Sequence, residues 1–246
     1  MAAALLIVSA YGQEYKIAKS TGRLEIIEVN HVSVEGHNGN EIVFTSQSRS
    51  RDNDERAKGL RALSSLGLED NTGLGLSVVD KAGVIEVHQL KKTEGPEIRI
   101  LVPKGVVVSY SHSSPFGNEI EVKNFQGEVR ISTVHNGVVL SNTTGPITVK
   151  TVHGGIEASL PTAPTAALRL ESVHGHVDLA LPVSTKANLS MSTDWGEVLV
   201  DPDFKIELDR SGDMTKYSGK IKGKLNGGGA EIALASNHNN IYLRKK

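Results

Sequence analysis

The chain has 246 residues, and its 27 Lys and Arg against 28 Asp and Glu give a formal net charge of −1. This balance provides no global attraction for nucleic acid or an anionic membrane surface. The sequence contains no cysteine, which excludes disulfides, thiolate metal sites and a cysteine nucleophile. Aromatic residues make up only 4%, which leaves few rings for a carbohydrate-binding platform.

The first residues are typical of a processing signal. Residues 2–10 form an apolar run that is too short to span a bilayer, and Ala10 and Gly12 place small residues where a signal peptidase cleaves. A basic segment ahead of the run is missing. We predict that residues 1–13 are a signal-peptide remnant, that the protein is exported to the periplasm or cell surface, and that the mature chain has no transmembrane segment. An apolar first strand packed on the core is the alternative.

Short strands are predicted next, around residues 24–26, 32–34 and 42–44, and again around 76–78, 84–87 and 98–101, because apolar and polar residues alternate there. Residues 47–72 interrupt them as a polar excursion. Within it, residues 54–63 have helical spacing with acidic residues first, and Gly67 follows as a stop signal. These features predict a short helix, with a surface loop as the alternative.

An internal repeat occupies the centre of the chain. Residues 127–140 (GEVRISTVHNGVVL) match residues 145–158 (GPITVKTVHGGIEA) column by column, at an offset of 18 (145 − 127). A third copy follows at an offset of 21 (174 − 153) and a fourth at 21 again (195 − 174). Each copy reads as a strand, a glycine-bearing turn and a second strand. One such unit cannot bury its apolar face alone, so stacked copies are expected.

The alternation within each copy predicts which side chains face the core. The inward positions are Val129, Ile131, Ile147, Val149, Leu168, Leu170, Leu189 and Met191. We expect Val129 and Ile147 to share one buried column, and Ile131 and Val149 another. Residues 14–246 are therefore predicted to form a single all-β domain, a single-stranded β-helix (solenoid) of the right-handed form with one short helical excursion.

The G-x-(V/I)-x-(V/I) strands, the T-x-x-G turns and the closing stretches 225–234 and 240–244 carry a family resemblance. Over roughly residues 75–244 the chain resembles the bacterial putative-adhesin β-solenoids, also called toastrack domains. The resemblance implies an extracytoplasmic or cell-surface location and an adhesive or scaffold role. It supplies no catalytic residues, and its motifs identify a fold better than a function.

A histidine column is the sharpest local feature. His135, His153 and His174 occupy one repeat position, and Trp195 takes it in the fourth copy. Converging imidazoles would indicate a metal or proton site, whereas a solvated turn residue copied by the repeat is the simpler interpretation. Rungs about 4.8 Å apart do not bring ring nitrogens to the 2.0–2.1 Å that zinc requires. We predict no metal site and no cofactor here.

Charged residues in the later copies give two further candidates. A polysaccharide lyase or hydrolase needs converging acids or bases, but the acids of this region, Asp178, Asp194, Glu197, Asp201 and Asp203, form no repeating column. We predict no catalytic residues. Lys220, Lys222 and Lys224 alternate on one strand face, either to contact an anionic polymer or to keep an outer strand from pairing with other chains. Together with Asp194 and Trp195 they are the candidate interaction residues.

The predicted function is therefore that of a non-enzymatic, exported solenoid, an adhesin or scaffold whose partner is an unidentified envelope polymer or protein and not nucleic acid. The alternative is a carbohydrate-active β-helix. Two close carboxylates in a groove lined by exposed rings would favour that alternative.

Overall fold

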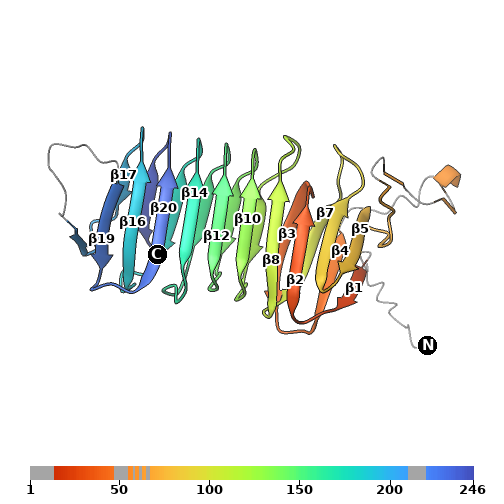
Figure 1. Cartoon of the computed structure of the whole chain (residues 1–246), viewed down its shortest axis with the longest axis horizontal. Helices are drawn as coiled ribbons and strands as arrows, with labels where there is room; N and C mark the ends of the chain where they lie inside the picture. The colour runs from red at the N-terminus through yellow and green to blue at the C-terminus, as the bar shows by residue number, and fades with distance from the viewer. Residues whose placement is uncertain (1–13, 47–54, 58, 61–62, 65–66, 210–219) are drawn as a thin grey trace, which may run out of the picture.

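The computed structural model describes residues 14–46, 55–57, 59–60, 63–64, 67–209 and 220–246. The predicted signal-peptide remnant at 1–13 lies outside these residues. Two long sheets face each other, and their strands lie side by side in a row from one end of the molecule to the other (Figure 1). Apolar side chains from both sheets fill the space between them as one continuous core.

Sheet A has ten strands. In spatial order they are β1 (Glu14–Ala18), β4 (Glu41–Ser46), β7 (Glu97–Pro103), β3 (His31–His37), β9 (Ile120–Lys123), β11 (Val138–Ser141), β13 (Ile156–Ser159), β15 (Val177–Leu181), β21 (Ile241–Lys245) and β17 (Val198–Val200).

Sheet B has eleven strands. Counted from the same end of the molecule they are β5 (Leu76–Lys81), β6 (Val84–Gln89), β2 (Gly22–Ile27), β8 (Val106–His112), β10 (Val129–Thr133), β12 (Ile147–Thr151), β14 (Leu168–Ser172), β20 (Ala230–Ser236), β16 (Ala187–Thr193), β19 (Lys220–Leu225) and β18 (Ile206–Leu208).

Each coil of the solenoid takes one strand from sheet B and the next strand from sheet A, as in β10 followed by β11. Coils stack in parallel, and the register pairs Val129 with Ile147 and Ile131 with Val149. All four side chains are buried. The predicted solenoid and its two core columns are therefore confirmed. The period of two explains the arrangement, because alternate residues point inward and each coil covers the apolar row of the one before.

The order of coils departs from the order of sequence at both ends. The coil β2–β3 lies between β6–β7 and β8–β9, and the coil β20–β21 lies between β14–β15 and β16–β17. Leu168 therefore pairs with Ile232, which in turn pairs with Leu189. The expectation that the fourth repeat copy stacks directly on the third is wrong. The closing strands have the same alternation as the repeat, so they fit the same register.

Antiparallel strands close the two ends of this parallel stack. β4 and β1 follow β7 in sheet A, and β5 follows β6 in sheet B. At the other end β19 pairs with β16, and β18 pairs with β19. In the excursion, Glu55–Ala57 form a 3-10 helix, while residues 47–54, 58, 61–62 and 65–66 lie outside the described structure. Within the described ranges, no helix has both the length and the apolar character needed to cross a membrane.

Candidate functional site

One long edge of the solenoid consists of the turns that lead from sheet B to sheet A. The predicted histidines lie there and stack face to face. Ring centroids of His135 and His153 are 5.4 Å apart, and those of His153 and His174 are 5.0 Å apart. His238, from the interleaved coil, stacks on His174 at 4.6 Å. We call these four exposed side chains the histidine ladder.

Backbone hydrogen bonds between successive turns hold the ladder in place. The N–H groups of His153, His174 and His238 donate to carbonyl oxygens of the neighbouring coils, at 2.8, 2.7 and 2.9 Å. The interplanar angles between neighbouring rings are only 14°, 7° and 11°. The ladder is therefore an ordered row whose spacing is imposed by the parallel stacking of the coils.

A column of buried hydroxyl groups lies directly beneath the ladder and closes each turn. Thr133 donates to the carbonyl oxygen of Asn136 at 2.7 Å, and Thr151 donates to that of Gly154 at 2.6 Å. Ser236 donates to Gly175 of the next coil at 2.9 Å. These bonds satisfy backbone acceptors that the turns would otherwise bury unpaired, so the turns are rigid before any partner arrives.

Asp194 and Trp195 lie at one end of this ladder. The pairing of Thr193 with Ser236 places Trp195 beside His238, and the Trp195 N–H donates to the Asn237 carbonyl at 3.0 Å. Trp195 is 79% exposed. Among the ring contacts of the described residues, stacking ends at His238. The sequence therefore placed Trp195 in the correct column but missed His238, which stands between it and His174.

The ladder geometry does not suit a metal ion. Imidazole lone pairs lie in the ring planes, and these planes are nearly parallel and 4.6 to 5.4 Å apart. Nitrogens held in this way do not converge on one point at about 2.0 Å. Across the described ranges, no group of three or more His, Asp or Glu side chains is arranged to hold a metal.

Three of the five acids that the sequence grouped together are held in ion pairs or in a turn. The single N–H of Arg244 Nε is shared between the two carboxylate oxygens of Asp178, at 2.7 and 3.0 Å. Asp203 binds Lys245, and Asp201 accepts the backbone N–H of Asp203 at 3.0 Å, as expected for a turn. These three carboxylates are engaged in structural contacts.

The lysine row lies on the outer face of sheet B, not on the turn edge. Lys220, Lys222 and Lys224 alternate along β19, which is paired with β16 on one side and with β18 on the other. Lys224 lies opposite Glu207 in this register. β18 pairs with β19 only from Gly223 to Leu225, so of the three lysines Lys224 alone lies within a stretch that has a partner strand on both sides.

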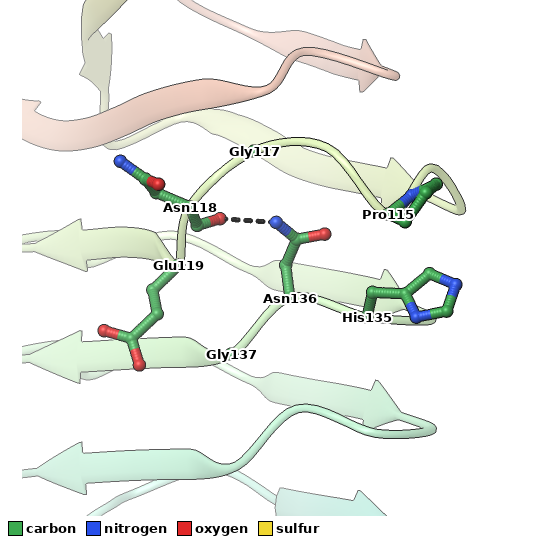
Figure 2. A pocket seen from close by; sticks show the side chains of 7 residues that line it. All are labelled: Pro115, Gly117, Asn118, Glu119, His135, Asn136 and Gly137. Atoms are coloured by element: carbon green, nitrogen blue, oxygen red, sulfur yellow. Dashed lines mark hydrogen bonds between the residues drawn. The ribbon is translucent and has the colours of Figure 1, made fainter. Parts of the chain in front are cut away.

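A shallow cavity of about 550 Å³ opens at the other end of the ladder (Figure 2). Its lining residues are Pro115, Gly117, Asn118, Glu119, His135, Asn136 and Gly137. The turn between β8 and β9, which includes residues 113–119, forms one wall. Glu28 fixes the start of this turn, accepting hydrogen bonds from the Ser113 N–H at 2.8 Å and the Ser113 hydroxyl at 2.7 Å.

Two polar atoms near this cavity are buried without a hydrogen-bond partner in the described structure: Oδ1 of Asn136 and Nδ1 of His112. Burial lowers the pKa of His112 below its ordinary value, an effect that the Glu28 carboxylate and the nearby Asn136 side chain oppose. Asn136, Glu119 and His112 were not among the candidates predicted from sequence. A signal for Asn136 existed, because it stands where the next two repeat copies have Gly154 and Gly175.

Comparisons with known proteins give matches only among solved structures. No family model matches the chain, and no curated protein matches it. A solved structure described as a putative cell adhesion protein from Clostridium sporogenes ATCC 15579 is similar over 96% of this chain and 100% of its own, with a TM-score of 0.46 and 13% identity. A putative adhesin from Bacteroides fragilis NCTC 9343 is similar over 96% and 98%, with a TM-score of 0.34 and 8% identity. Identities this low carry no information about a shared ligand.

Proposed function

We propose that this protein is a non-enzymatic, extracytoplasmic or cell-surface solenoid that binds a linear polymer of the cell envelope along its histidine ladder. The observation that carries this proposal is the ladder itself. Four exposed imidazoles follow one turn edge with ring centroids 4.6 to 5.4 Å apart, and the strand register places Trp195 next in the same row.

The chemistry of the ladder suits a repeating ligand. Stacking covers most of the ring faces, so the ring edges with their nitrogen atoms remain for contact. A neutral imidazole offers one hydrogen-bond donor and one acceptor. A polymer with one polar unit per rung would repeat such a contact along the edge, and many individually modest contacts on one ligand add up to firm attachment. A saccharide chain has units of about this length and carries hydroxyl groups on each.

The rigidity of the edge supports the same conclusion. Each turn is fixed by a buried hydroxyl and by hydrogen bonds to the neighbouring coil, so little conformational freedom is lost when a partner binds. The formal net charge of −1 offers no long-range attraction for nucleic acid. An envelope polysaccharide is therefore a better match than a polyanion that is recognised by charge.

One observation favours the alternative, a carbohydrate-active enzyme. Glu119 and His135 line the same cavity, and a carboxylate with an imidazole is a possible acid–base pair. The binding function is preferred because the recurring feature is the ladder, and most of the other acids predicted from sequence are held in ion pairs or a turn.

A glycan array combined with a pull-down from envelope extract tests the proposal. The intact protein should retain a polysaccharide, and His153→Ala with His174→Ala should lose it while the fold, measured by circular dichroism, is unchanged. His88→Ala is the matched control, because His88 lies on β6 outside the ladder. Equal retention by the ladder variants, or cleavage of the polysaccharide by the intact protein, would contradict the proposal.

A further inference from the structure

The two sheets stop at different levels at each end of the solenoid. At the end that carries β1, which we call the head (right in Figure 1), sheet A continues beyond the coil β6–β7 for two strands, β4 and β1, and sheet B for one, β5. At the other end, the tail, sheet A stops at β17, whereas sheet B continues beyond the coil β16–β17 for two strands, β19 and β18. Sheet A therefore overhangs at the head, and sheet B overhangs at the tail.

The overhanging strands carry apolar side chains that the opposite sheet does not fully cover. Among the described residues, the partly buried hydrophobic side chains that pack against the core all lie on terminal strands: Tyr15, Ile17, Val198, Ile206 and Ile221. These side chains belong to β1 at the head and to β17, β18 and β19 at the tail. Burying the rest of their surface would be favourable.

The uncovered surface of the tail is the inner face of β19 and β18. Ile221 lies opposite Met191, and Leu208 is aligned with Leu189 through Gly223. Since Met191 and Leu189 are buried in the core, Ile221 and Leu208 also face inward. Leu208 is nevertheless 54% exposed. The tail is therefore a step, in which the inner face of two sheet B strands has no sheet A strand opposite it.

β17 presents unpaired backbone groups beside this step. The Ile241 N–H donates to the Glu197 carbonyl, and the Asp201 N–H donates to β21 in the same way, each at 2.9 Å. Backbone groups alternate in direction along a strand, so the N–H and C=O groups of Val198 and Val200 face away from β21. Within the described ranges these groups have no hydrogen-bond partner. An edge of this kind is a template for another strand.

The edge of sheet B at the head is closed in comparison. The Asn71 amide binds both outward backbone groups of Val78, because its Nδ2 donates to the Val78 carbonyl at 2.7 Å and its Oδ1 accepts the Val78 N–H at 2.9 Å. Thr72 donates to the Leu76 carbonyl at 3.2 Å. These side chains take the place of a neighbouring strand and protect β5 from pairing. β17 has no such protection in the described structure.

The head of a second copy fits the step at the tail. β1 is antiparallel to β4, and β4 is antiparallel to β7, so β1 runs in the same direction as the parallel strands of sheet A, including β17. A second copy in the same orientation therefore brings β1 beside β17 as a further parallel strand. Tyr15 and Ile17 then lie opposite the inner face of β19 and β18, which covers both apolar surfaces.

Other arrangements of two copies fit less well. In the head-to-tail arrangement, sheet A has two strands between the end coils (β1 and β4) and sheet B has three (β19, β18 and β5), a difference of one strand spacing, about 4.8 Å. Two facing tails would place four strands of sheet B opposite none of sheet A. Two facing heads would place four strands of sheet A opposite two of sheet B. The head-to-tail arrangement leaves the smallest mismatch.

We propose that copies of this chain associate head to tail, with β1 of one copy pairing with β17 of the next and sheet A continuing across the joint. Such a contact uses different surfaces on the two copies and leaves one head and one tail free, so further copies can add in the same direction. Successive copies keep the same orientation, which places their histidine ladders along one edge of the assembly. This inference goes beyond the polymer-binding proposal and does not depend on it.

Sedimentation velocity of the intact protein over roughly 1 to 500 µM tests the proposal, since a contact this small is expected to be weak. The sedimentation coefficient should rise with concentration. Val200→Pro removes an outward N–H without breaking the pairing with β21, and Ile17→Lys places a charge on the inner face of β1. Both variants should stay monomeric with unchanged circular dichroism. Val79→Lys is the control, because Val79 is 41% exposed on β5 but points outward, opposite Glu86, and this variant should associate like the intact protein.

A mixture of the two variants tests the polarity of the joint and shows that both are folded. Val200→Pro keeps an intact head and Ile17→Lys keeps an intact tail, so an equimolar mixture should form a dimer of one copy of each and nothing larger. Association of Ile17→Lys alone would indicate a tail-to-tail dimer, and association of Val200→Pro alone a head-to-head dimer; either result overturns the proposal. It is also wrong if the intact protein or the mixture stays monomeric at every concentration.

Discussion

Replacing Val149 with aspartate measures how strongly the stacked core holds this solenoid together. Val149 is 0% exposed, and its register neighbours are Ile131 at 3% and Leu170 at 0%. An aspartate there has apolar neighbours on both coils and no charged partner. We expect Val149→Asp to lower the free energy of unfolding by most of its total.

The magnitude follows from two contributions. A fully buried carboxyl group has its pKa raised by roughly 3–5 units, and each unit corresponds to about 1.36 kcal/mol, so the charge costs about 4–7 kcal/mol at pH 7. Loss of the buried valine side chain adds about 1.5–3 kcal/mol. The sum approaches the roughly 5–15 kcal/mol by which folded domains are stable.

Urea unfolding followed by circular dichroism measures this change, with Thr148→Asp as the matched control. Thr148 points outward in the same strand, and its register neighbours are Arg130 and Arg169, so an aspartate there should change stability by less than about 0.5 kcal/mol. The Val149→Asp defect should also shrink near pH 4. Because the folded pKa is raised above the unfolded value, the penalty grows only as pH rises from about 4 toward the folded pKa. Equal midpoints for the two variants at pH 7 would refute the buried-column argument.

Four further outcomes are expected. Gly154→Ala should destabilise the protein by at least about 2 kcal/mol in thermal unfolding, because the new Cβ would lie 2.0 Å from the Asn136 carbonyl oxygen; an unchanged melting temperature would show that the turns are not so closely stacked. Burial lowers the pKa of His112 in the folded protein, so as pH falls below about 6.5 the His112 ring takes up a proton in the unfolded chain before it does in the folded one. The free energy of unfolding should therefore decline from pH 7 to 5.5, and the decline should be smaller in His112→Gln. Zinc titration by calorimetry should give no submicromolar stoichiometric signal, and one that disappears in His153→Ala would show that the stacked rings rearrange to bind metal. Screens for reducing-end release and unsaturated products should detect no polysaccharide cleavage, and turnover lost in Asp194→Asn would establish the enzymatic alternative.

The central coils could be predicted because matching positions in the repeat copies set their register. Val129, Ile147 and Leu168 occupy matching positions in successive copies, and the structure pairs them in that order. The interleaved ends could not be predicted in this way. β20 lies between β14 and β16, and its alternation fits the register of both. Alternation predicts which face of a strand is buried, but it does not predict which strand lies beside it. Pairing between segments this far apart depends on how the whole stack closes.

The candidate site could also be predicted only where its residues recur in the repeat. The histidine ladder was visible in the sequence because His135, His153 and His174 recur, while His238 was missed since it belongs to an interleaved coil outside the repeat. The cavity depends on a residue that does not recur. Asn136 stands where the neighbouring coils require glycine, and a side chain is possible there only because the turn before it is longer. In a stacked fold, residues that recur are constrained by the coil on each side, so a repeat makes their positions predictable. A side chain at a position that is closed in the neighbouring coils, as Asn136 is, breaks the repeat, and its contacts depend on a turn whose length the repeat does not set.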